Sequence, residues 1–257
     1  MVVSNAVTVQ SVDRAIQIIK KLKENPDGIG VTDLSIILGV SKSTVHRLLM
    51  SLYQGGFVRQ DSITDKYKLG FHFLEIADVV RENLDVRNIA APLLNELSSI
   101  TGETVHLVIR DQDEVVYIDK VESPETIRMY SRVGKRAPMH CTGVGKVFLA
   151  YLSMDEVKEI IKEKPLKRFT SNTICSQEDL IKELNLIRKN GYAIDDEEHE
   201  LGVKCAAAPI LNFKGNITAA LSVAAPIMRI DSEKFSLMTK QVIKYSNELS
   251  ELIGSYK

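Results

Sequence analysis

The chain has 257 residues, of which 44% are hydrophobic and 26% charged, and its formal net charge is −1. This composition is typical of a globular protein with two domains of ordinary size, and it argues against a uniformly basic nucleic-acid coat protein. There is no apolar run of about 18 residues, no signal-peptide pattern and no CxxC pair among the three cysteines, which together predict a cytoplasmic protein with reduced thiols and no membrane span.

Residues 32–52 read TDLSIILGVSKSTVHRLLMSL and predict two short helices separated by Gly39. Ser41 stands where the N-cap of the second helix belongs. One face of that helix is a buried stripe at helical spacing, formed by Val45, Leu48, Leu49 and Leu52. The opposite face carries side chains that can reach phosphates and base edges, namely Lys42, Ser43, Thr44, His46 and Arg47. This pattern predicts a helix-turn-helix whose second helix enters the major groove of DNA; the alternative is a surface helix pair with a solvated polar face.

The segments that flank the helix pair favour DNA binding. Upstream, residues 11–25 predict a helix that covers the back of the motif through an apolar stripe of Val12, Ala15, Ile16, Ile19 and Leu22. Downstream, two short alternating segments, 57–59 and 67–69, are joined by DSITDK and predict a β-hairpin. A hairpin directly after a recognition helix is a wing, and its basic side chains, Arg59, Lys66 and Lys68, would lie near the duplex backbone.

Positive charge is concentrated in the same part of the chain. Residues 1–70 hold nine Lys and Arg against six Asp and Glu, a net of +3, whereas residues 71–257 hold 24 against 28, a net of −4. A single module with so little positive charge binds DNA weakly. We therefore predict that two copies of the chain act together on double-stranded operator DNA, with residues 11–25 and 71–83 as the candidate contact helices.

The hydrophobic pattern predicts three parts: a winged helix-turn-helix domain at 8–70, a linker helix at 71–84 and an α+β domain at 85–257. The third part begins with a helix that ends at Thr101-Gly102. Alternation predicts its strands, at 104–109, 115–121, 127–131, 205–212 and 217–224. Helical periodicity predicts four further helices, at about 143–152 and at 154–164, 176–190 and 232–255. A loop that begins at residue 137 leads into the first of them.

A glycine-bearing loop in the third part, residues 134–146, runs into a helix whose first backbone N–H groups can bind an anion. Lys146 is followed by Val147 where a nucleotide-binding P-loop has Ser or Thr. Nucleotide hydrolysis is therefore not expected. A structural alternative for these glycines is a tight turn with close backbone packing.

Residues 191–205 contain five acidic side chains and lead into an apolar strand. A solvated loop explains Glu197, Glu198 and Glu200 as well as any function does. Asp195 and Cys205 are different, because they flank the loop at the ends of predicted strands. The small residues that follow Cys205, Ala-Ala-Ala-Pro, leave room for a bound molecule.

Catalytic and metal-binding alternatives depend on few residues. His140 with Cys141, or His199 with Cys205, could form a nucleophilic pair, but neither has a protease-like local signature. A zinc site of His140, His199 and Cys205 is a second alternative, although none of these pairs has zinc-motif spacing.

Three motifs together resemble the IclR family of bacterial transcription regulators: SVDRAIQII with TDLSIILGVSKSTVHRLL, then GKRAPMHCTGVGKVFLAYL, and GYAIDDEEHELGVKCAAAPI. The resemblance covers about residues 11–253. It implies an N-terminal winged helix, a linker helix and a C-terminal effector domain related to GAF domains, in a dimer or tetramer. It also implies a repressor whose operator affinity changes when a small organic acid binds against Gly143-Val144 and the residues Asp195 and Cys205.

A narrower resemblance, in the segment IRMYSRVGKR, is to the branch of this family that senses 2-keto-3-deoxygluconate. On this basis we expect backbone N–H groups of Gly143 and Val144 to receive a carboxylate, and Asp195 to accept hydrogen bonds from ligand hydroxyls. The expected pocket wall is completed by Cys205, Met129 and Met139. No cofactor, metal or catalytic residue is expected. The competing hypothesis is an enzyme, metal-dependent or small-molecule-binding, built on the second domain with a merely structural helix pair.

Overall fold

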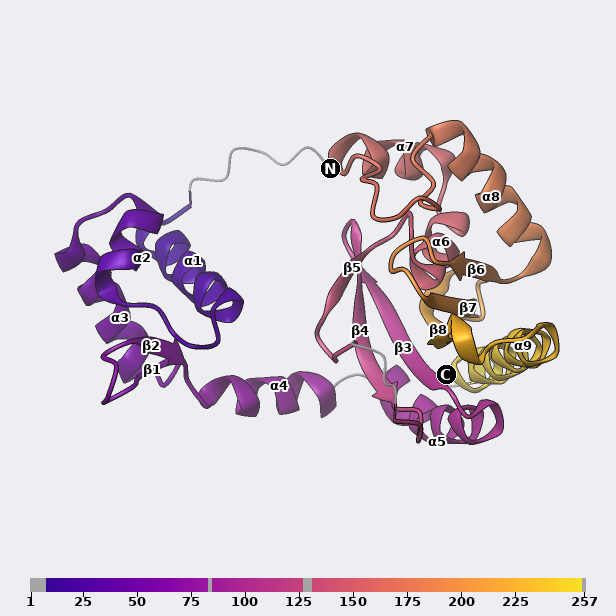
Figure 1. The fold of residues 1–257 in the computed structure, drawn as a ribbon, viewed down its shortest axis with the longest axis horizontal. Helices are drawn as coiled ribbons and strands as arrows, with labels where there is room; N and C mark the ends of the chain where they lie inside the picture. The colour runs from indigo at the N-terminus through magenta and orange to yellow at the C-terminus, as the bar shows by residue number, and fades with distance from the viewer. Residues whose placement is uncertain (1–7, 83–84, 127–130, 256–257) are drawn as a thin grey trace. The chain divides into compact units, whose positions relative to one another are not determined.

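The computed structural model describes residues 8–82, 85–126 and 131–255, and the chain divides into two compact units, residues 1–83 and 84–257 (Figure 1). The N-terminal unit has the order helix, helix-turn-helix, hairpin, helix: α1 (Gln10–Glu24), α2 (Val31–Leu38), α3 (Lys42–Gln54), β1 (Val58–Gln60), β2 (Tyr67–Leu69) and α4 (His72–Glu82). The predicted helix pair, hairpin and following helix are all present. Within the described ranges, no helix is both long and apolar enough to cross a membrane.

Local sequence signals set the ends of the helix pair. Gly39 ends α2 in the left-handed conformation, at φ 63°, which favours glycine. Ser41 caps α3, and Val45 and Leu49 of α3 are fully buried. These side chains pack with residues of α1, α2 and the hairpin in one small core, whose buried members are Ile18, Leu22, Ile29, Leu34, Val45, Leu49, Val58 and Tyr67.

The predicted buried face of α1 is wrong in part. Leu22 is buried as expected. Ile18 is also buried, although it lies outside the predicted stripe. Val12 and Ile16 instead remain 53% and 45% exposed. The reason is that a small domain covers only a narrow strip of the helix, so α1 keeps a second apolar strip at its surface.

The C-terminal unit contains a six-stranded antiparallel sheet in the order β5-β4-β3-β8-β7-β6. Its strands are β3 (Thr104–Asp111), β4 (Glu114–Val121), β5 (Arg136–Pro138), β6 (Ala193–Asp196), β7 (Val203–Leu211) and β8 (Ile217–Pro226). Its helices are α5 (Asp85–Thr101), α6 (Gly143–Ala150), α7 (Met154–Glu163), α8 (Gln177–Asn190), the short 3-10 helix η1 (Ile227–Arg229) and α9 (Ser232–Ser255). The predicted α+β class is confirmed.

Two short strands differ from the prediction. β5 occupies residues for which a loop was expected, and β6 is the strand expected to end near Asp195, although no residue range was predicted for it. Each has three or four residues and lies at an edge of the sheet, where so short a strand leaves almost no alternating signal in the sequence. The strand predicted at 127–131 falls almost entirely outside the described residues.

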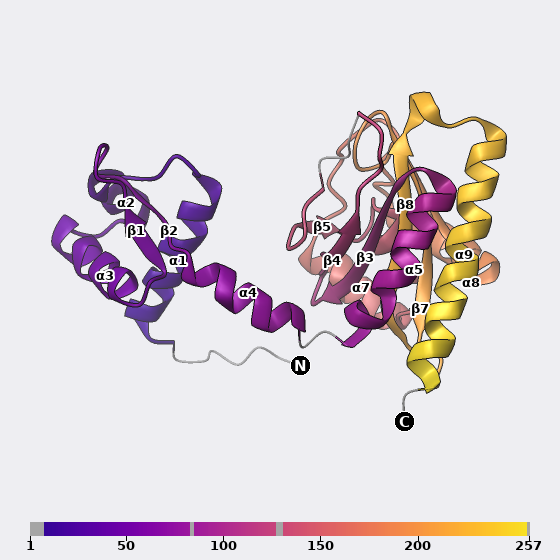
Figure 2. The same cartoon turned by 90° about the horizontal axis from the view of Figure 1, so that it is seen from below.

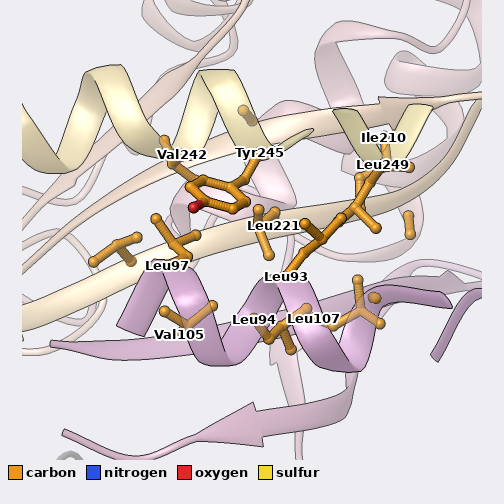
Figure 3. Close-up of a cluster of buried hydrophobic side chains, with 14 of the residues drawn as sticks. Leu93, Leu94, Leu97, Val105, Leu107, Ile210, Leu221, Val242, Tyr245 and Leu249 are labelled. Carbon is orange, nitrogen blue, oxygen red and sulfur yellow. The ribbon is translucent and has the colours of Figure 1, made fainter. Parts of the chain in front are cut away.

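The two faces of this sheet carry separate cores. α5 and α9 lie side by side against one face (Figure 2), where side chains such as Leu97, Leu221 and Tyr245 interdigitate (Figure 3). α6, α7 and α8 contribute to a second core on the other face, together with Cys205 and Ala207 of β7. The N-terminus of α6 lies against β7, beside Asp195 of β6.

Candidate functional site

The polar face of α3 is exposed in the N-terminal unit. Of the five side chains predicted to face the groove, Thr44 is half-buried. The other four are exposed, namely Lys42, Ser43, His46 and Arg47. The Ser41 hydroxyl accepts a hydrogen bond of 3.3 Å from the backbone N–H of Thr44. It also lies 2.9 Å from the hydroxyls of Ser43 and Thr44. α3 is thus a capped helix whose free N-terminal N–H groups and basic side chains are available to a phosphate-rich partner.

The wing presents fewer free charges than the sequence suggested. Arg59 and Lys66 are exposed, and the Arg59 guanidinium lies 5.1 Å from the ring centroid of Phe71. Lys68 also lies in the wing, where its ammonium group pairs with Asp61 at 2.9 Å. Hydrogen bonding to Lys68 holds the pKa of Asp61 well below its usual range. Most of the charge of Lys68 is therefore neutralised within the wing.

A cavity of about 50 Å³ lies in the C-terminal unit, between the start of α6 and the sheet. Its walls come from seven elements and the loops beside them: His106, Tyr117, Ser131, Lys135, Ala137, Thr142, Gly143, Val144, Asp195, His199, Glu200, Val203, Cys205, Ser222 and Ala224. Four predicted effector residues are brought together here, namely Gly143, Val144, Asp195 and Cys205. Met139 does not line this cavity; it is buried and faces a different one. Met129 lies outside the described residues.

The start of α6 reaches the sheet closely because residue 143 is glycine. A Cβ atom at Gly143 would lie 2.8 Å from Sγ of Cys205, which is too close for any other residue without displacement. Thr142 caps the helix by accepting a 3.1 Å hydrogen bond from the N–H of Gly145. Asp195 and Cys205 are direct partners in the β6–β7 ladder. One helix start and one strand pair thus form a single wall of the cavity.

Asp195 is a perturbed carboxyl group. It is only 6% exposed, and its Oδ1 accepts a 2.8 Å hydrogen bond from the backbone N–H of Glu198. Burial raises the pKa of Asp195 to about 7, with a further contribution from the charge of Glu198. Near neutral pH this side chain can therefore donate as well as accept a proton in a hydrogen bond. A buried carboxyl with a raised pKa in a concave site is typical of a functional group.

A buried ion pair beside this wall was missed by the sequence prediction. Lys146 of α6 is only 1% exposed, and its ammonium group pairs with Glu198 and, at 3.2 Å, with Glu183 of α8. Burial raises the pKa of Glu198, an effect that the nearby Lys146 opposes. The only available signal was a lysine inside the apolar run GVGKVFLA, all of whose residues are buried.

The expectation of a solvated acidic loop is wrong for Glu198, which is buried, and holds for Glu200, which is exposed. Glu197 is half-buried, and its carboxylate accepts a 2.7 Å hydrogen bond from the backbone N–H of Gly202. Glu197 therefore closes a turn within the acidic segment, and Glu198 joins this segment to Lys146 of α6.

A polar end of the cavity was also not foreseen. Nε2 of His106 lies 2.7 Å from the hydroxyl of Ser131, and Nδ1 lies 3.4 Å from the hydroxyl of Ser222. The ring of Tyr117 contacts His106 edge-on, with centroids 5.1 Å apart. Burial, with the charges of Lys120 and Lys135, lowers the pKa of His106 to about 3, so this imidazole is neutral at physiological pH. Both imidazole nitrogens are thus engaged by serine hydroxyl groups, and those hydroxyl groups line the same cavity as Asp195.

The thiol of Cys141 lies beside a histidine but is held in its protonated form. The cysteine–histidine contact that forms is Cys141 with His199, whose Sγ and Nδ1 are 3.7 Å apart, rather than either pair suggested by the sequence. Burial, with the charges of Asp195 and Glu198, raises the pKa of Cys141 to about 12, which leaves the thiol protonated. Within the described parts of the chain, no group of three or more His, Cys, Asp or Glu is placed to hold a metal ion. The zinc alternative therefore gains no support.

Comparison with known families gives two matches that together span most of the chain. Residues 11–62 match the IclR helix-turn-helix domain, and residues 79–251 match the C-terminal domain of the bacterial transcriptional regulator IclR. The first match contains the α2–α3 pair, and the second contains the cavity at the start of α6.

Individual relatives are similar over most of their length. The HTH-type transcriptional regulator XynR of Escherichia coli is 38% identical over 246 residues, which cover 96% of this chain and 98% of XynR. The HTH-type transcriptional regulator KdgR of Dickeya chrysanthemi is 40% identical over 247 residues, which cover 96% of this chain and 81% of KdgR. The crystal structure of Thermotoga maritima IclR matches with a TM-score of 0.78 and 33% identity, over 95% of this chain and 98% of that one.

Proposed function

The chain belongs to the IclR family of bacterial transcriptional regulators. From this we propose that it is a transcriptional repressor and that a small organic acid controls its affinity for its operator DNA. DNA binding by the helix-turn-helix is the activity of the family, and the relatives named above are regulators rather than enzymes. A regulator of operator DNA acts in the cytoplasm. The exposed basic face of α3 supports Lys42, Ser43, Thr44, His46 and Arg47 as the residues that face the groove, with Arg59 and Lys66 of the wing near the backbone.

The observation that carries the effector proposal is the cavity at the start of α6. Backbone N–H groups at Gly143 and Val144 lie at a helix N-terminus, where the helix dipole favours an anion. Asp195 and Cys205 belong to the same wall of the cavity, and the hydroxyl groups around His106 suit a ligand with several oxygen atoms. A coupling of only ~1–3 kcal/mol between this cavity and the DNA-binding unit is enough for regulation.

Two acids are the first to be tested. The resemblance of IRMYSRVGKR to the 2-keto-3-deoxygluconate branch makes that sugar acid one candidate. The cavity volume of about 50 Å³ corresponds to roughly four water positions, which favours a compact keto acid such as pyruvate. Calorimetric titration against 2-keto-3-deoxygluconate, pyruvate, glyoxylate and aromatic acids tests the proposal. Binding of none of these carboxylates would contradict it.

We expect acid binding to strengthen as the pH falls from about 8 to about 6. Asp195 has a pKa of about 7, and a bound carboxylate places a second negative charge beside it, so binding takes up a proton. With one linked proton, the dissociation constant should change by at most about tenfold per pH unit. In Asp195→Asn this pH dependence should be lost. The check is calorimetric titration at several pH values in buffers of different ionisation enthalpy.

The matched control for this prediction is Asp196→Asn. Asp196 is the next residue of β6, but it does not line the cavity and its half-exposed carboxylate pairs with Lys204 at 2.7 Å. This variant should keep the wild-type profile. An affinity that is independent of pH in the wild type, or full pH dependence in Asp195→Asn, would remove Asp195 from the site.

We also propose that the chain acts as an oligomer joined through its N-terminal unit. α1 exposes Val12 and Ile16, and α4 exposes Leu74 and Val79, which are 66% and 58% exposed. Apolar strips of this kind on two helices of a small domain are typical of a contact surface. A two-fold arrangement would also supply the second DNA-binding module that a weakly basic domain needs.

Light scattering should therefore give a multiple of the 28.7 kDa chain mass for the wild type. The double variant Val12→Asp/Ile16→Asp should dissociate at micromolar concentration and lose operator affinity, because charges in an apolar contact are not solvated. Leu186→Asp is the control, since Leu186 is 54% exposed on α8 of the C-terminal unit, outside the DNA-binding domain. A monomeric wild type with intact operator binding would overturn this proposal.

A further inference from the structure

The C-terminal unit has a second cavity, of about 210 Å³, which the function described above does not use. Pro138, Met139 and His140 line it, whereas the neighbouring residues Ala137 and Thr142 line the effector cavity. Of the residues that the structure describes, none lines both. The two cavities are therefore separate but share one stretch of backbone.

The walls of the second cavity are mainly apolar. Leu149 comes from α6, Ile160 and Ile161 come from α7, and Leu166 and Phe169 come from the loop after α7. A dry cavity of about 150 Å³ lined by Leu, Ile and Phe side chains binds benzene. The larger volume here fits one aromatic ring with a small substituent.

The charges at the rim are compensated within the protein. Lys164 pairs with Asp113 at 3.4 Å and with Glu114 at 3.9 Å. Nζ of Lys167 lies 5.5 Å from the ring centroid of Phe169. An ionic ligand would gain little from a rim of balanced charge, which favours a neutral molecule.

His140 supplies the polar group in this cavity. Burial lowers its pKa, so the ring is neutral near pH 7. Nε2 lies 2.9 Å from the backbone oxygen of Lys167, and because a carbonyl oxygen can only accept, Nε2 carries the proton. Nδ1 is then the acceptor nitrogen of the ring, which suits a ligand hydroxyl.

Phe169 connects the two cavities. Its ring centroid lies 6.0 Å from that of His140, in the second cavity, and 5.1 Å from that of His199, which lines the effector cavity. A molecule that contacts Phe169 therefore acts on the environment of His199 through one intervening ring.

We propose that this cavity is a second small-molecule site, which takes a neutral compound the size of one aromatic ring with a single hydroxyl group, and that its occupation is sensed at His199 through Phe169. This site goes beyond the proposed effector function and does not depend on it. Its failure and the failure of effector binding would be seen in different measurements.

Benzyl alcohol is the probe, and NMR of the full-length protein with labelled methionine methyl groups is the measurement. Met139, which is 2% exposed and lines the cavity, should shift in a saturable way at millimolar benzyl alcohol, while Met50 and Met228 should not. Leu166→Trp, which fills the cavity from a half-buried loop position, should weaken binding at least tenfold. Leu186→Trp makes the same change at an exposed position of α8 outside the cavity and should bind as the wild type does.

Histidine-ring resonances test the connection. His140 and His199 should both shift with benzyl alcohol, and Phe169→Leu should remove the shift of His199 while that of Met139 remains. The absence of a saturable Met139 shift in the wild type would overturn the site, and this holds even if Leu166→Trp does not fold. Equal affinity in a folded Leu166→Trp would overturn its location. An unchanged His199 in the wild type, or a His199 shift that persists in Phe169→Leu, would overturn the connection.

Discussion

Replacing Lys146 by alanine should lower the free energy of unfolding of the C-terminal unit by about 3–5 kcal/mol at pH 7. The variant leaves the carboxylate of Glu198 buried without its cation, and Oε2 of Glu198 already has no hydrogen-bond partner among the described residues. An unpaired buried charge costs far more than a lost surface ion pair. Urea denaturation followed by circular dichroism measures the loss.

Two further variants make this result specific. Lys146→Met/Glu198→Gln removes both charges and should recover most of the stability, because the cost arises from the unpaired carboxylate and not from the missing lysine. Lys182→Ala removes an exposed lysine of α8 that pairs with Glu178 and Asp179, and it should change stability by less than about 1 kcal/mol.

The pH dependence of the stability of Lys146→Ala gives a second test of the buried ion pair. Because burial raises the pKa of Glu198, this carboxyl takes up a proton more readily once Lys146 is gone. The destabilisation by Lys146→Ala should therefore shrink as the pH falls. If Lys146→Ala were as stable as the wild type at pH 7, the buried pair would have no structural role.

The second large effect is expected at the operator. Arg47→Ala should weaken specific binding by ~1–3 kcal/mol, roughly 5- to 150-fold, if Arg47 reads a base edge. Lys42 lies in the first turn of α3, where a phosphate contact is expected, so Lys42→Ala should weaken specific and nonspecific DNA alike and reduce the salt dependence. Gel-shift titration on operator and scrambled DNA at several salt concentrations separates the two effects.

The matched control is Lys23→Ala, which removes an exposed lysine in the last turn of α1. Since it changes the net charge by the same amount as Lys42→Ala, any difference between the two reports position and not total charge. Unchanged operator affinity in the double variant Lys42→Ala/Arg47→Ala would remove α3 from the interface.

The DNA-binding unit was largely predictable because its signals are local. Gly39, Ser41 and the stripe of α3 lie within a few residues of one another, and each acts through the backbone or the face of a single helix. The structure shows these features as the sequence predicts them. The pattern could not show which face of α1 is buried, because this helix has two apolar strips and the core is small. In the structure, Ile18 and Leu22 are the residues of α1 that are buried in this core.

The effector cavity could be anticipated only in part. Asp195 and Cys205 were recognisable as neighbours of a strand end, and Gly143 as the start of a helix. His106, Ser222 and Lys146 carried no such signal. Each is one polar residue in a buried element, and its partner lies far along the chain, 116 residues away for His106 and Ser222 and 52 for Lys146 and Glu198.

The sequence by itself thus determined the helix-turn-helix, the α+β class and the family, because short-range periodicity, caps and motifs encode them directly. Only the tertiary structure decided which charges are buried, which of the predicted pocket residues meet, and that Met139 faces a different cavity. The physical reason is that burial and pKa depend on the atoms that surround a group from every side. In an antiparallel sheet with a non-sequential strand order, those atoms come from segments that no local pattern connects.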